Sequence, residues 1–189
     1  MRRLTRTAVA TMGVSLVVLA LAPVAVARLG LQVLGLQPGD RFGPDQVYNG
    51  LGCTGRNLSP ELRISGVPAQ AKSLAITIHD PDAPTQSGWW HWLVYDLPAG
   101  TTRLTQGAGA ARSSALPAGA RQGPNDFGAR AYGGVCPPAG DRPHHYRVTL
   151  WALKVRTLGA PSQASAALID YLIEANAIAH RTVVVRYSR

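Results

Sequence analysis

Three strand-like segments, the first of which alternates between apolar and other residues, constrain this chain more than any other feature. They span Ser73–His79, Trp89–Leu97 and Tyr146–Val155, and turn-forming glycine, proline or aspartate separates them. A period of two puts successive side chains on opposite faces of a strand, so the pattern predicts three strands of a sheet. Shorter segments at Leu62–Ile64 and Val183–Tyr187 predict two more. The fold class that follows is mainly β.

Two other segments have different patterns. From Ser162 to Ala179, apolar residues recur at steps of three and four, which is typical of an amphipathic helix, and Pro161 precedes it as a start signal. Gly100–Phe127 is rich in glycine, alanine and serine and has little hydrophobic pattern, which predicts a long surface excursion. There is no repeat and no long linker, so we expect one domain from residue 28 to residue 189.

The first 27 residues are distinct from the rest. Arg2, Arg3 and Arg6 precede twenty uncharged residues that end in Ala25-Val26-Ala27. A basic start, an apolar middle and a small-x-small end are typical of a secretory signal peptide. A retained membrane anchor is the alternative, because twenty uncharged residues can span a bilayer. Cleavage after Ala27 predicts a periplasmic or secreted protein, and retention predicts a membrane-anchored one.

Charge and cysteine content depend on that leader. The chain has 19 Lys+Arg against 10 Asp+Glu, a formal net charge of +9, and three of the arginines lie in the leader. The other arginines are scattered and form no run with interleaved aromatic residues, so we do not expect nucleic acid as a partner. Cys53 and Cys136 are the two cysteines. Export favours a disulfide between them, and two buried free thiols are the alternative.

Polar side chains gather where the predicted strands end. Asp80 and Asp82 belong to the run Asp-Pro-Asp-Ala-Pro directly after the first strand, where the prolines stop the ladder. Asp80 has the parity of Ile76 and Ile78, so we expect it to point inward, where a carboxylate needs a partner. The alternative is an Asx-type turn in which both carboxylates cap backbone amides.

A second cluster is Trp89-Trp90-His91-Trp92. The period of two predicts Trp89 and His91 on one face, with Trp90 and Trp92 on the other. A single histidine in a strand is more often a satisfied core residue than a ligand. Three tryptophans around one histidine nevertheless form an apolar wall with a single hydrogen-bonding side chain whose protonation can change with pH.

A third cluster lies in Cys136–Tyr146, where a rigid proline and glycine loop enters the third strand. His144 and Tyr146 share one face of that strand, and His145 points the other way. Asp, His and Tyr side chains at one mouth suit a small anionic group, because His and Tyr donate to its oxygens and Asp orients the imidazoles. A carboxylate beside a phosphate requires a protonated histidine or a cationic substituent on the phosphate.

Enzyme and metal chemistry are the alternatives for the same residues. Asp80, His91 and His144 could take part in acid–base chemistry or offer three ligands to a metal ion. However, the chain has no His-Glu-x-x-His or Gly-x-Ser-x-Gly motif, and these three spacings match no known type of metal site. We therefore expect no catalytic activity, no metal ion and no cofactor.

These segments together resemble the phosphatidylethanolamine-binding protein family, most closely its bacterial branch of Raf-kinase-inhibitor-like proteins. Asp80–Pro84, Trp89-x-His91, Pro137-Pro138 and His144-x-Tyr146 carry the resemblance. It extends from about Tyr48 to Val155, and more weakly to Tyr187. Cys53–Pro60, Gly66–Pro68, Asn125–Gly128 and Tyr132–Gly134 agree with it. Three features depart from the branch: His79 replaces an acidic or small residue, Val135 replaces a proline, and the ending Thr182–Arg189 fits only loosely.

The resemblance implies a large antiparallel sheet packed on a smaller one, with a C-terminal helix. It also implies a non-catalytic protein with a small pocket for phosphate-like anions or phospholipid head groups, which would be its only contact with a membrane besides the leader. The implied ligand-binding residues are Asp80, His91, His144 and Tyr146, with walls formed by Trp89, Ala83, Pro84, Pro137 and Pro138. The alternative function is inhibition of an exported protease, or of another protein such as a kinase, through surface loops including Gly100–Phe127.

Overall fold

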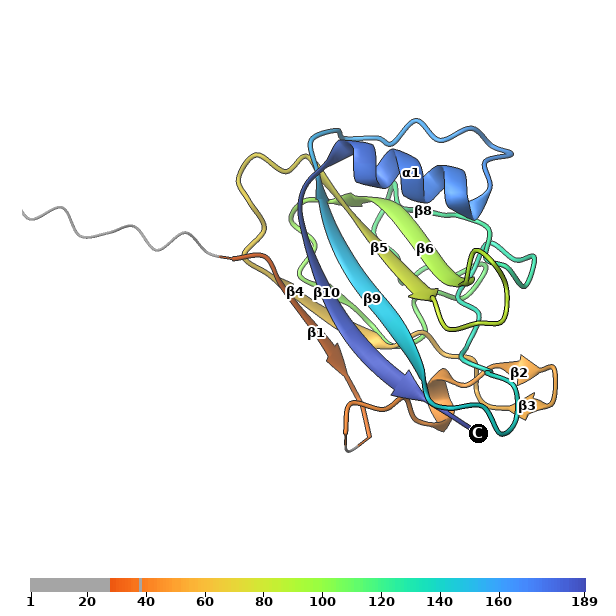
Figure 1. Cartoon of the computed structure of the whole chain (residues 1–189). Coiled ribbons are helices and arrows are strands. Elements are labelled where there is room, and N and C mark those ends of the chain that lie inside the picture. The colour runs from red at the N-terminus through yellow and green to blue at the C-terminus, as the bar shows by residue number, and fades with distance from the viewer. Residues whose placement is uncertain (1–27, 38) are drawn as a thin grey trace, which may run out of the picture.

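A computed structural model describes residues 28–37 and 39–189, so the predicted leader, residues 1–27, lies outside the described residues. Antiparallel strands and one α-helix make up the fold (Figure 1), which confirms the mainly β class. Within the described ranges, no helix is long and apolar enough to cross a membrane. The elements are β1 Gly30–Leu34, the 3-10 helix η1 Pro44–Gln46, β2 Asn49–Gly50, β3 Cys53–Thr54, β4 Glu61–Ser65, β5 Ser73–Asp80, β6 Trp89–Pro98, β7 Arg103–Leu104, β8 Arg121–Gln122, β9 His144–Leu153, α1 Ala166–Asn176 and β10 Ala177–Tyr187.

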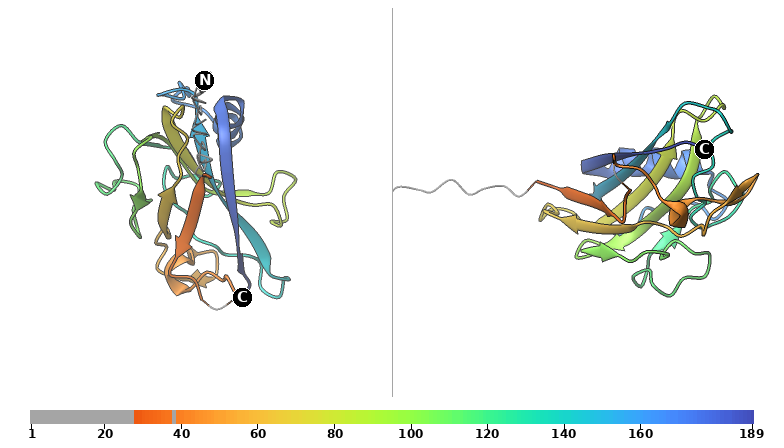
Figure 2. Two further views of the ribbon diagram at one scale, coloured as in Figure 1. Left: turned by 90° about the vertical axis from the view of Figure 1, so that its left-hand side faces the viewer. Right: turned by 90° about the horizontal axis from the view of Figure 1, so that it is seen from below.

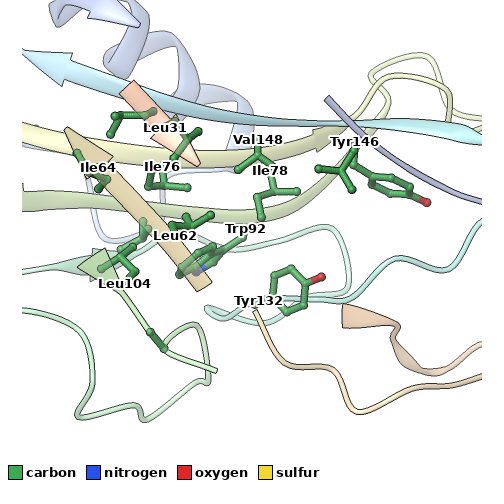
Figure 3. Packing of buried hydrophobic residues seen from close by; sticks show 14 of the residues in the cluster. Leu31, Leu62, Ile64, Ile76, Ile78, Trp92, Leu104, Tyr132, Tyr146 and Val148 are labelled. Atoms are coloured by element: carbon green, nitrogen blue, oxygen red, sulfur yellow. The ribbon is translucent and has the colours of Figure 1, made fainter. Parts of the chain in front are cut away.

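A five-stranded sheet in the order β10-β9-β5-β6-β8 packs on a three-stranded sheet in the order β1-β4-β7. The core between them is built from alternate residues of each strand, which all point to the facing sheet. In Figure 3, aliphatic side chains of β5 and β9 meet those of β1, β4 and β7. The predicted arrangement of a large sheet on a smaller one is confirmed. The residues at the centre of this core are Leu31, Leu62, Ile64, Leu74, Ile76, Ile78, Leu104, Val148 and Leu150.

The helix α1 covers the opposite face of the large sheet. Its fully buried Ile169 and Ile173 pack against Leu93 of β6 and Leu153 of β9. Apolar residues of the large sheet are therefore buried on both faces, and β5 is buried along almost its whole length. This double burial explains why the central strands contain so few exposed polar positions.

The helix is shorter than the sequence pattern predicts. It begins at Ala166, where the Ser165 side chain accepts a hydrogen bond from the N–H of Leu168. It ends at Asn176, and from Ala177 the chain continues as β10, which pairs with β9. The prediction of a helix over 162–179 is wrong at both ends, because the capping serine and the sheet pairing set its limits. β10 then runs from α1 to the opposite end of the molecule (Figures 1 and 2).

A β-bulge in β6 changes the predicted faces of the tryptophans. The pairing of β5 with β6 shifts by one residue at His91, which is the extra residue of the bulge. Trp92 therefore lies on the same side as His91, fully buried between the two sheets (Figure 3). Trp90 packs on the helix side. The prediction that Trp90 and Trp92 share a face is wrong, because the bulge interrupts the period of two.

The segment Gly100–Phe127 is more ordered than a surface excursion. It contains β7 and β8, which lie at the edges of the small and large sheets. Leu104 and Ala108 are buried in the core. The side chain of Asn125 is also buried, and its Oδ1 accepts hydrogen bonds from the N–H groups of Phe127 and Ala129.

A disulfide joins Cys53 and Cys136, with their Cα atoms 6.0 Å apart. Cys53 belongs to β3, and Cys136 lies in the loop that leads to β9. The bond therefore fastens the small β2–β3 hairpin to the entrance of a central strand. The disulfide expected from the two cysteines is confirmed, and neither cysteine is a free thiol.

Candidate functional site

Three chain segments meet at one end of the large sheet (Figure 1): the end of β5, the start of β6 and the start of β9. Pro81 follows β5 and Pro143 precedes β9, so both strands stop at this end. A cavity of about 160 Å³ lies between them. All nine predicted site residues line it: Asp80, Ala83, Pro84, Trp89, His91, Pro137, Pro138, His144 and Tyr146.

Asp80 and His144 form the polar pair at the base of the cavity. The Nδ1 of His144 lies 2.7 Å from Oδ2 of Asp80, and both side chains are almost completely buried. The other oxygen of Asp80, Oδ1, accepts a hydrogen bond from the N–H of Asp82 at 2.9 Å. The inward direction predicted for Asp80 is thus correct, and so is the Asx-type turn, because one oxygen serves each role.

His144 also faces a second carboxylate. Its Nε2 lies 3.5 Å from Oδ2 of Asp141, which is partly exposed at the outer side of the site. The imidazole is therefore placed between a buried carboxylate and an exposed one. A proton on either ring nitrogen has an acceptor to bind, so the ring has a fixed orientation.

His91 is held by two backbone carbonyls. Its Nδ1 lies 2.7 Å from the oxygen of Gly133 and 3.1 Å from that of Gly134, so Nδ1 carries a hydrogen and donates it. Burial lowers the pKa of His91 to about 4, although these carbonyls and the charge of Asp80 act in the opposite direction. The ring is therefore neutral near pH 7, and its Nε2 is free to accept a hydrogen bond from a group in the cavity.

The two glycines that hold His91 are required by close packing. A Cβ on Gly133 would lie 2.3 Å from a ring carbon of Phe127, and a Cβ on Gly134 would lie 2.4 Å from the backbone nitrogen of Tyr48. Contacts this short do not occur for real side chains, so both positions exclude alanine. The Tyr-Gly-Gly motif is thus the support for the histidine.

Two residues that line this cavity contain a buried donor without a regular hydrogen bond. The hydroxyl of Tyr146 and the indole Nε1 of Trp89 are buried, and neither makes a hydrogen bond of normal geometry among the described residues, although the Tyr146 hydroxyl is close enough to the Asp80 carboxylate for the two to interact. Burial raises the pKa of Tyr146 far above its ordinary value, with the charge of Asp80 as the next cause, so the hydroxyl keeps its proton. In Figure 3 this hydroxyl points away from the aliphatic core. Unpaired buried donors are rare in folded proteins, because each lacks the bond it would make in water.

Asp82 has a different role from Asp80. Its Oδ2 accepts hydrogen bonds from the backbone N–H and the Nδ1 of His145, both at 2.8 Å, and Arg142 approaches Oδ1 at 3.2 Å. Burial raises the pKa of Asp82, but the bonds from His145 and the charge of Arg142 outweigh it and hold that pKa below its usual value. The carboxylate therefore fastens the turn after β5 to the start of β9.

The cavity has four lining residues that the sequence patterns do not predict: Leu51, Thr85, Phe127 and Cys136. Phe127 contacts Trp89 and His91 edge-on, with ring centroids 5.2 and 5.6 Å away. The sequence contained a pattern that could have identified Phe127, because this residue lies in the Asn-Asp-Phe-Gly motif. Cys136 is adjacent to Pro137, so its position follows once the disulfide is known. Nothing in the sequence marks Leu51, which is an exposed residue of the β2–β3 hairpin.

Comparison with known proteins gives this geometry a context. A family model described as phosphatidylethanolamine-binding protein matches residues 37–188. The chain belongs to the phosphatidylethanolamine-binding protein family. The matched range includes all thirteen residues that line the cavity.

Several bacterial proteins are similar along more than half of the chain. The Escherichia coli protein YbcL is 47% identical over 152 residues, which are 80% of this chain and 83% of YbcL. The E. coli protein YbhB is 40% identical over 153 residues, or 81% of this chain and 96% of YbhB. The crystal structure of E. coli YbcL, described as a new member of the mammalian PEBP family, superposes with a TM-score of 0.83 and 45% identity, covering 86% of this chain and 99% of that one. A Mycobacterium tuberculosis protein named putative lipoprotein LppC is 41% identical over 103 residues, 54% of this chain and 47% of LppC.

The positions at which this sequence departs from the bacterial branch of the family have structural roles. Val135 donates its N–H to Gln46 and accepts from Tyr48, and a proline would lose the first of these bonds. The Nε2 of His79 contacts the carbonyl of Ser87 at 2.9 Å, across the turn that joins β5 to β6. Tyr187 lines a neighbouring cavity that also contains Cys53. The disulfide thus lies between that cavity and the one lined by Cys136.

Metal binding would require several ligating side chains around one point. Within residues 28–37 and 39–189, no group of three or more His, Cys, Asp or Glu side chains is arranged to hold a metal ion.

Proposed function

We propose that the protein binds a phosphate-like anion, either free or as the head group of a phospholipid, and does not act on it chemically. The observation that carries the proposal is the pair of unpartnered buried donors, Tyr146 O–H and Trp89 Nε1–H, in one small cavity. A bound phosphoryl oxygen would give these donors the acceptor that they lack. Membership of a family of binding proteins supports the same function.

The size of the cavity favours a head group over a whole lipid. Its volume of about 160 Å³ is below the range of roughly 300–1,000 Å³ that is usual for drug-sized ligands. A phosphate with a short substituent fits such a space, and acyl chains would remain outside. The walls of Pro84, Pro137 and Trp89 are rigid, so the mouth is preformed.

The charge of Asp80 sets the protonation state of the ligand. With His91 neutral near pH 7, a phosphate dianion would face a buried carboxylate, which is unfavourable. A phosphate monoester with its second proton retained avoids this, because its P–OH donates to an oxygen of the site. The second pKa of a phosphate ester is about 6, so this form is accessible near neutral pH.

A conservative change at Tyr146 tests the proposal. In Tyr146→Phe the ring is kept and only the unpartnered hydroxyl is removed, so we expect no loss of stability. We expect binding of O-phosphoethanolamine, measured by isothermal titration calorimetry at pH 6.5, to weaken by about tenfold, as for the loss of one charge-assisted bond. Titrations in two buffers of different ionisation enthalpy report the proton that arrives with the ligand.

Tyr132→Phe is the matched control. The hydroxyl of Tyr132 is buried too, but it donates to the carbonyl of Gln46 at 2.8 Å, so its loss should lower stability and leave the affinity unchanged. Equal affinity of wild type and Tyr146→Phe would contradict the assigned site. Release of inorganic phosphate from the ligand, followed by phosphorus NMR, would contradict the non-catalytic part of the proposal.

We also propose that the protein is exported. The basic and apolar leader of residues 1–27 supports this, as does the disulfide, because such bonds persist in oxidising compartments. The name of the similar M. tuberculosis protein, putative lipoprotein, points in the same direction. An exported binding protein would meet its phosphorylated ligand outside the cytoplasm.

A further inference from the structure

A second groove lies beside the edge strand β8. It has a volume of about 490 Å³, and three arginines line it: Arg112, Arg121 and Arg130. These come from separate parts of the chain, namely the loop before β8, β8 itself and the loop after it. The rest of the lining is neutral: Tyr95, Ala111, Ser113, Leu116, Pro117, Ala120, Gln122 and Ser162. We call this site the arginine groove.

The groove is held in shape by bonds that leave two of its arginines available. Arg130 donates to the backbone carbonyls of Gln122 and Ser162, which fixes its guanidinium across the groove. Arg112 and Arg121 are exposed, and no hydrogen bond or ion pair engages their side chains within the part of the chain that the structure describes. Each guanidinium keeps its planar set of donors free for a ligand.

The loop that carries Arg112 is itself fastened to the sheet. The side chain of Gln122 accepts from the indole of Trp92 at 2.7 Å and donates to the carbonyl of Ala110 at 3.0 Å. The N–H of Ser113 donates to that same carbonyl of Ala110. The groove is therefore a preorganised feature, which lowers the entropy lost when a ligand binds.

The charges of the groove select for anions. Its described lining contains three positive side chains and no carboxylate. Asp96 is close enough for Arg121 to affect its pKa, but its Oδ1 is engaged by the N–H of Leu158 at 2.7 Å. Like charges without a counterion repel one another, so a negatively charged ligand stabilises this arrangement. We propose that the arginine groove binds a small molecule that carries two or more phosphate or sulfate groups.

Two observations favour a small polyanion over an acidic peptide. β8 is an edge strand, but Arg130 already donates to the carbonyl of Gln122 on that strand. A peptide that adds as a strand needs such edge groups free. The three arginines also line a single groove, which fits one compact ligand with several anionic groups.

Calorimetric titration with inorganic tripolyphosphate tests the proposal. The test variant is Arg112→Gln/Arg121→Gln, and the control is Arg63→Gln/Arg181→Gln, which removes the same charge from exposed positions on β4 and β10. We expect the test variant to bind at least tenfold more weakly and the control to bind like wild type. We also expect affinity to fall as NaCl is raised from low to physiological concentration.

Each other outcome overturns the proposal. Equal weakening in both double variants would mean a general effect of net charge. A loss in Tyr146→Phe, with none in the arginine variant, would place the ligand in the other cavity, and that result would leave the proposed head-group site intact. No binding by wild type at millimolar tripolyphosphate, or tighter binding of a poly-glutamate peptide, would exclude a small polyanion as the ligand.

Discussion

His91 illustrates how burial, rather than residue type, decides the charge of a side chain. The same imidazole would titrate near pH 6.5 in an unfolded chain, but in the folded protein burial lowers its pKa to about 4. Two glycine carbonyls fix its Nδ1–H, so the neutral form is also the oriented form. The cavity thus contains a neutral acceptor and donor group at a pH where an exposed histidine would be partly charged.

This pKa predicts a pH dependence of stability. Between pH 6.5 and 4 the unfolded chain binds a proton at His91 and the folded protein does not, so the free energy of unfolding falls as the pH is lowered through that window. By pH 4.5 the loss from this residue amounts to about 2–3 kcal/mol, given 1.36 kcal/mol per unit of pKa difference. Above pH 6.5 the residue contributes no pH dependence.

Urea unfolding of wild type and His91→Asn at pH 7 and pH 4.5 measures this contribution. Asparagine keeps an N–H donor for the carbonyl of Gly133 but does not titrate. We expect the variant to lose less stability between the two pH values, and the difference isolates His91 from the other titrating groups. Parallel losses in the two proteins would show that His91 keeps an ordinary pKa in the folded state.

Within a single strand, the alternation of apolar residues correctly predicted which side chains point inward. The inward directions of Asp80 on β5, and of His144 and Tyr146 on β9, follow from their spacing to apolar neighbours, and the structure has them buried as expected. Parity fails for Trp92, because the bulge at His91 is set by how β6 pairs with β5. A single strand does not contain that information.

Other elements were missed for the same kind of reason. β1, Gly30–Leu34, is a strand because it pairs with β4, and its sequence has no clear alternation of its own. β10 begins at Ala177, inside the predicted helix, because Ala177 pairs with Leu153. The cavity residue Leu51 depends on where the disulfide holds the β2–β3 hairpin. Pairing partners and cross-links, which lie far away in sequence, decide these cases.

The start of α1 depends on a capping serine. The hydroxyl of Ser165 accepts from the N–H of Leu168, which satisfies one of the free donors of the first turn. We expect Ser165→Ala to lower the free energy of unfolding by about 1 kcal/mol. Ser162→Ala, a few residues earlier and outside the helix, is the control and should have little effect, as measured by chemical denaturation. Equal values for the two variants would mean that the cap does not stabilise the helix.

The disulfide links two parts of the molecule that are distant in sequence. It joins residues 83 positions apart. Closing a loop of that length restricts the unfolded chain and stabilises the fold by about 4–5 kcal/mol in the chain-entropy model. The site depends on it directly, because Cys136 is part of the cavity wall.

Export and the disulfide together predict the form of the mature protein. We expect protein recovered from outside the cytoplasm to have the intact mass of residues 28–189 less two hydrogens, and denatured, unreduced samples to show no titratable thiol. Mass spectrometry and thiol titration measure the two properties separately. A mass that includes residues 1–27 would indicate a retained anchor, and two thiols would mean that the bond does not form in the cell.

The position of β9 in the large sheet has a consequence for the order in which the protein is made. β5 lies between β6, its immediate successor in the chain, and β9, which is synthesised much later. The contact between Asp80 and His144 spans 64 residues, and Tyr187 of β10 pairs beside His144 in turn. Contacts so distant in sequence form slowly and late. A stalled or truncated chain can therefore pair β5 with β6 and still lack the cavity, which is completed only when the start of β9, with His144 and Tyr146, has emerged from the ribosome.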